Sequence, residues 1–138
     1  MSTNLQLITD ALRGINVIDE TETPSAEQGT FCLRQMNQML ATWKDSNNID
    51  LGYFAQSSTA AACPIPEWAE TGVWGKLALR VAAHFGAQVP IGTVATADDG
   101  YTTILRTIMN MKLEGADMSH LPRGTGQYGS GYNALTNS

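Results

Sequence analysis

The sequence predicts a mainly α-helical protein, with a small four-helix bundle-like body, a short β element and an extended C-terminal arm. Two observations carry this prediction. Apolar residues recur every three or four positions along most of residues 4–113, which is the period of helices that bury one face. From residue 119 onward, glycine becomes frequent and the periodicity ends. We therefore expect a helical body over residues 1–118 and an extended arm over residues 119–138.

Two helices are predicted in the first third of the chain. The first runs from about Asn4 to Leu12 and has apolar residues on one face. The second runs roughly from Ser25 to Asp45, with Thr23 as its N-cap and Pro24 at a first helical position, where the missing N–H of proline costs nothing. Its buried face is expected to consist of residues spaced three, four and three apart: Leu33, Met36, Leu40 and Trp43.

The short segment Ile49–Phe54 is predicted to be a brief strand or an extended segment, because it is too short and too interrupted for a helix. A loop follows, and a third helix opens at Pro66 and ends before Gly86. The buried face of this third helix is expected to consist of Trp74, Leu77, Val81 and Phe85.

The fourth helix is predicted from about Thr93 to Leu113. Its apolar residues alternate spacings of three and four: Val94, Ala97, Tyr101, Ile104, Ile108 and Met111. Such a heptad-like seam is typical either of a bundle helix or of a coiled coil. We favour a bundle helix packed on its three neighbours, with a coiled-coil contact to another chain as the alternative.

The arm is predicted because residues 119–133 contain four glycines and two tyrosines without any period. A stretch of this kind buries too little apolar area to offset the loss of chain entropy on folding. We expect it to be extended and ordered only by a partner. Tyrosine side chains at intervals make good anchors for that purpose, since each has a large apolar ring and one polar tip.

The composition fits a single globular domain and excludes several function classes. The chain has 138 residues, 15% of them charged, and a net charge of −5. A sequence-specific nucleic-acid binder normally shows a basic patch, whereas the Lys and Arg residues here are scattered. An acidic wall could still line a DNA channel, because it repels phosphates. The low charge content favours a surface that other chains partly cover.

No secretion signal or membrane-spanning segment is expected, so we predict a soluble protein without a membrane partner. Cys32 and Cys63 are interpreted as structural thiols, because two distant cysteines do not make a disulfide framework. His84 and His120 have no partners at metal-ligand spacing. We expect no metal.

Two sequence patterns could carry enzyme chemistry. Residues Gly124–Gly129 match G-x-G-x-x-G, but a dinucleotide site needs a strand before this pattern and a helix after it. We therefore expect no cofactor. Paired carboxylates, Glu67 with Glu70 or Asp98 with Asp99, are the basis of one alternative function, a small hydrolase of cell-wall glycan. A second alternative is a generic helical protein-binding module. We favour neither, and expect a protein that is not an enzyme.

The order of the parts resembles a known phage family. The residues that carry the resemblance are ALRGI at 11–15, LRQMNQMLATW at 33–43, IDLGY at 49–53, LALRVA at 77–82 and Leu121-Pro122 in the arm. Over residues 5–113 the chain is similar to the head-to-tail connector, or adaptor, of short-tailed bacteriophages, of the packaged-DNA stabilisation or tail accessory factor type. It departs from the family in its short tail and in a longer acidic loop at residues 19–23.

The resemblance implies a structural virion protein at the head–tail junction, assembled in the host cytoplasm. Twelve copies would form a ring below the portal protein, extend the channel through which double-stranded DNA passes, help to retain packaged DNA and hold the tail tube, nozzle or needle. The arm would clasp the portal. By this resemblance the portal-binding residues are Leu121, Pro122, Arg123, Gly124, Gly126, Tyr128, Gly129 and Tyr132.

Overall fold

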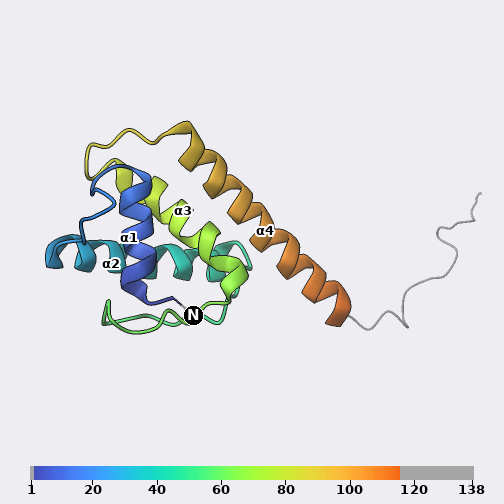
Figure 1. The fold of residues 1–138 in the computed structure, drawn as a ribbon. Coiled ribbons are helices and arrows are strands. Elements are labelled where there is room, and N and C mark those ends of the chain that lie inside the picture. The colour runs from blue at the N-terminus through green and yellow to red at the C-terminus, as the bar shows by residue number, and fades with distance from the viewer. Residues whose placement is uncertain (1, 116–138) are drawn as a thin grey trace, which may run out of the picture.

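The structure, a computed structural model, describes residues 2–115 and confirms a mainly helical body (Figure 1). The predicted boundary at residue 118 and the whole arm lie outside the described residues. The described elements are α1 (Asn4–Gly14), α2 (Ala26–Ser46), the 3-10 turn η1 (Glu67–Ala69), α3 (Glu70–Ala82) and α4 (Ile91–Gly115). None of the helices in this part of the chain is long and apolar enough to cross a membrane.

The first two helices begin at capping boxes. The hydroxyl of Thr3 accepts a hydrogen bond from the backbone N–H of Gln6, and the Gln6 side chain accepts one from the Thr3 backbone. Ser25 and Gln28 repeat this arrangement at the start of α2. The prediction of Thr23 as N-cap is therefore wrong: the reciprocal bonds to Gln28 place the start of the helix after Ser25.

The strand predicted over Ile49–Phe54 is not formed. The chain turns twice there, with positive φ at Asn48 and Gly52, and the carboxylate of Asp50 accepts a hydrogen bond from the Gly52 N–H. Among the described residues, the antiparallel pairing is limited to one isolated bridge between Thr3 and Ala62.

Helix α3 lies at the centre of the body and packs against each of the other helices. Most predicted core residues are buried: Leu33, Met36, Leu40, Trp43, Leu77, Val81 and Ile104. The remainder are half-buried against that core: Trp74, Phe85, Tyr101 and Ile108. Phe85 is less enclosed than predicted because α3 ends at Ala82 and Phe85 lies in the following turn.

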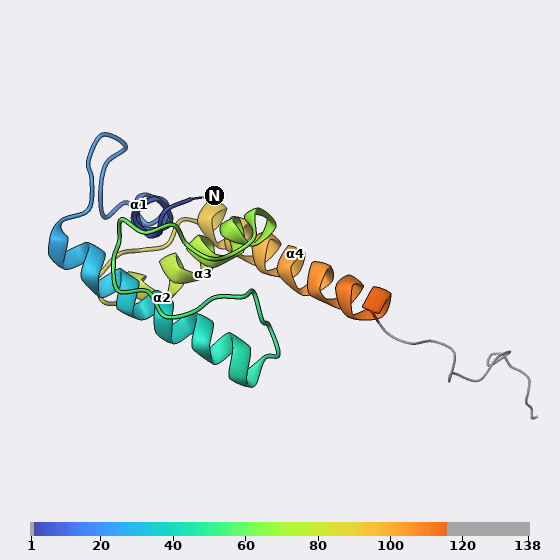
Figure 2. The same cartoon turned by 90° about the horizontal axis from the view of Figure 1, so that it is seen from below.

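Helix α4 differs most from its prediction. Its packing is concentrated on α3 and η1 and does not extend equally over three neighbours. With 25 residues against 13, it is about 38 Å long beside an α3 of about 20 Å. Its C-terminal half therefore extends past the other helices, as Figures 1 and 2 both show. Met111 lies in this half and is exposed, and Val94, near the start of the helix, is exposed as well.

Candidate functional site

The predicted portal-binding residues, Leu121 to Tyr132, lie outside the described residues. The structure places only the helix that leads toward them. The first candidate site in the described part of the chain is therefore the exposed C-terminal half of α4.

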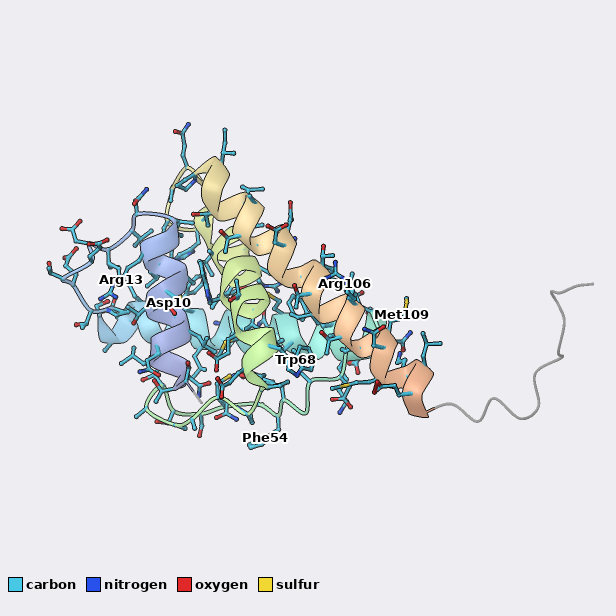
Figure 3. The ribbon with its side chains drawn as sticks, turned by 45° about the vertical axis from the view of Figure 1, so that its right-hand side comes forward. Asp10, Arg13, Phe54, Trp68, Arg106 and Met109 are labelled. Atoms are coloured by element: carbon cyan, nitrogen blue, oxygen red, sulfur yellow. The ribbon has the colours of Figure 1, made fainter. Side chains whose placement is uncertain are left out.

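Large apolar side chains gather on this half of α4. The exposed fractions are 63% for Met109, 59% for Leu113, 52% for Met111 and 42% for Leu105. Figure 3 shows Met109 and Arg106 on the side of α4 that faces away from the body. A helix with apolar residues beyond its packed face normally buries them against something else. This surface can therefore bind a partner.

The apolar residues of this surface are visible in the sequence, but the predicted bundle would bury them. The spacing of the seam at Tyr101, Ile104 and Ile108 reports the side of α4 that packs on α3. Leu105 and Met109 stand beside that seam in the sequence, and a bundle packed on all sides would have buried them as well. They are exposed because α4 packs mainly on α3 and η1, and no other described element covers its opposite side.

A second candidate surface lies at the other end of the body, at the start of α2. An open hollow of about 420 Å³ is lined by Ala26, Glu27, Thr30, Phe31 and Arg34, and we call it the α2 hollow. The ring of Phe31 stacks on the imidazole of His84, with ring centroids 3.9 Å apart, and meets Phe85 edge-on. His84 thus has a packing role. The sequence pattern does not predict this aromatic cluster, because Phe31 is 53 residues away from His84.

One carboxylate of each pair in the hydrolase alternative has a structural partner. The Glu70 carboxylate accepts hydrogen bonds from the backbone N–H and the hydroxyl of Ser2, at 3.2 and 2.8 Å, which holds the N-terminal segment on α3. The Asp98 carboxylate forms an ion pair with Lys76 at 2.9 Å. Both contacts join elements of the fold.

Both cysteines are buried free thiols, which agrees with the structural role predicted for them. Burial raises the pKa of the Cys32 thiol to about 11. It also raises the pKa of the Cys63 thiol to about 12, with a smaller contribution from the negative charge of Glu70. Each thiol therefore stays protonated and unreactive at neutral pH. Within residues 2–115, no cluster of His, Cys, Asp and Glu residues could hold a metal ion.

No protein-family profile matches the chain, and no curated protein matches it in sequence.

Proposed function

We propose that this protein is a structural virion protein of a tailed bacteriophage, which forms the head-to-tail connector ring below the portal. In this function it extends the DNA channel, retains packaged DNA and provides the attachment platform for the tail. It works by assembly and performs no chemical turnover.

The observation that carries the proposal is the exposed C-terminal half of α4. Its large apolar side chains lie on a helix that projects from the body (Figure 2). In the sequence, residues 119–138 follow this helix. A projecting apolar helix followed by a segment rich in glycine and tyrosine suits a protein that is held between other proteins. The net charge of −5 agrees with a channel wall that repels the phosphates of passing DNA and so does not adhere to it.

The proposal is tested by mixing the full chain with the portal protein of the same phage and examining the mixture by light scattering and electron microscopy. We expect a ring of this protein on one face of the portal. The absence of any complex between the full chain and the portal would overturn the proposal.

Deletion of residues 121–138 separates the connector from a generic binding module. The truncated chain is expected to lose portal binding while its helical circular dichroism is unchanged, because the described helices end at residue 115. A chain with residues 121–138 in scrambled order is the matched control for length and composition. If the truncated chain binds the portal as tightly as the full chain does, the arm is not the attachment segment.

A further inference from the structure

We propose that the C-terminal half of α4 of one copy docks head-to-tail on the α2 hollow of a second copy. The α4 surface in this contact, which we call the α4 tip, consists of Leu105, Arg106, Met109, Lys112 and Leu113. The inference rests on the proposed function in one respect, because a ring supplies the second copy. The character of the two surfaces does not depend on that function.

The five residues of the α4 tip share one side of the helix. At about 100° per residue, they fall within a sector of about 120°. The apolar residues Leu105, Met109 and Leu113 form a stripe about 12 Å long, since each is separated from the next by four positions. The two cations lie at the edges of this stripe. The tip therefore has an apolar centre and a basic rim.

The α2 hollow offers an apolar lining next to an acidic loop. Its lining combines apolar Phe31 and Ala26 with exposed Glu27 and Arg34, whose charges are opposite. The preceding loop carries three more exposed carboxylates, those of Asp19, Glu20 and Glu22. Residues 19–34 hold four acids and one arginine, so their net charge is −4 + 1 = −3.

The charge distribution favours a second copy of this chain as the occupant. Residues 104–113 carry two cations and no anion, a net charge of +2. The other residues of the chain hold six cations and 13 anions, a net charge of −7. Arg106 forms no ion pair among the described residues, and the Lys112 amine reaches only the carbonyl oxygen of Asn48, at 3.5 Å. The cations of the tip are thus available to an acidic partner.

The two surfaces cannot meet within one molecule. The start of α2 and the end of α4 lie at opposite ends of the body in both Figure 1 and Figure 2. Contact between them must therefore join two copies through different surfaces. A heterologous contact of this kind repeats from copy to copy and produces a ring when the rotation closes.

The contact is tested by disulfide trapping between two variants of the full chain, Met109→Cys and Thr30→Cys, mixed with and without portal. Both native thiols are buried, so the background is low. We expect a mixed dimer on oxidation. The matched control replaces Thr30→Cys by Ser57→Cys, an exposed position in the loop between α2 and η1. Equal yields for the two pairs, predominant trapping between two Met109→Cys copies, or no trapping in either condition would overturn the inference.

A charge exchange supplies a second measurement. Arg106→Glu in the Met109→Cys copy is expected to lower the trapping yield about fivefold. Glu27→Arg in the Thr30→Cys copy is expected to restore it. If neither substitution changes the trapping yield, the proposed charge complementarity between Arg106 and Glu27 is wrong.

The two proposals fail separately. Portal binding without trapping would leave the connector function standing and remove this interface. Trapping without portal binding would leave the interface and remove the connector function.

Discussion

At the scale of single residues, glycine decides how closely α3 and α4 approach. A Cβ atom added at Gly100 would lie 2.5 Å from the backbone nitrogen of Gly72, and one added at Gly75 would lie 2.7 Å from the Cα of Ala97. The two helix backbones are therefore in direct contact at their crossing. In the sequence, Gly100 looks like a weak point in the helix, because glycine costs about 1 kcal/mol against alanine in a helix interior.

Replacement of this glycine is expected to destabilise the protein. Gly100→Ala should lower the free energy of unfolding by about 1–3 kcal/mol, because the new methyl group collides with backbone that cannot move alone. Urea unfolding followed by circular dichroism measures the change. Gly92→Ala is the matched control, since a Cβ there meets nothing within 4 Å. It should raise stability by up to about 1 kcal/mol. Equal effects of the two substitutions would contradict the close approach.

At the scale of elements, the long loop between α2 and η1 is held by side-chain amides rather than by its own secondary structure. Asn37 of α2 donates a hydrogen bond to the carbonyl oxygen of Gln56 at 3.0 Å and accepts one from the Gln56 N–H at 3.0 Å. It also accepts one from the hydroxyl of Tyr53. Asn4 of α1 donates to the carbonyl oxygen of Ser58 at 2.9 Å. Two helices thus fix the loop from two sides.

Loss of the Asn37 amide should release this loop. Asn37→Ala is expected to lower the free energy of unfolding by about 1–3 kcal/mol, because part-buried backbone and hydroxyl groups lose their partners. It should also speed chymotrypsin cleavage at Tyr53 and Phe54. Asn110→Ala, at an exposed position of α4, is the control and should change stability by less than about 0.5 kcal/mol. Unchanged cleavage in Asn37→Ala would show that the loop has another anchor.

At the scale of the whole molecule, the two buried thiols make stability depend on alkaline pH. An unfolded cysteine titrates near pH 8.5, whereas the folded Cys32 has a pKa raised to about 11 and Cys63 one raised to about 12. Above about pH 9 the unfolded chain loses thiol protons that the folded chain keeps. The free energy of unfolding must therefore fall as the pH rises through this range, and the contribution of the thiols is fully present below it.

Urea unfolding at pH 7, 9 and 11 measures this dependence. We expect a progressive loss of stability for the native chain above pH 9. The double variant Cys32→Ala/Cys63→Ala, although less stable at pH 7 because it loses buried volume, should lose less between pH 9 and 11. Parallel curves for the two proteins would mean that other groups dominate the alkaline transition.

The sequence by itself determined the helices and most of the core. Periodicity identifies a buried face wherever a helix packs on one side, and it placed Leu33, Met36 and Leu77 correctly. Caps and turns were less certain, because Thr23 and Ser25 are both good caps and only the bonds to Gln28 distinguish them. The strand predicted at residues 49–54 failed for a similar reason, since a turn at Asp50 competes with extended backbone.

The tertiary structure alone decided which surfaces stay uncovered. Met109 is exposed because it lies on the side of α4 that faces away from the body, and the α2 hollow depends on Phe31 and His84 meeting across the fold. Neither fact can be read from the local sequence, because the exposure of a side chain depends on which distant segments pack against it. The sequence therefore determined which residues can form helices, whereas packing decided where two ends of the body remain open to a partner.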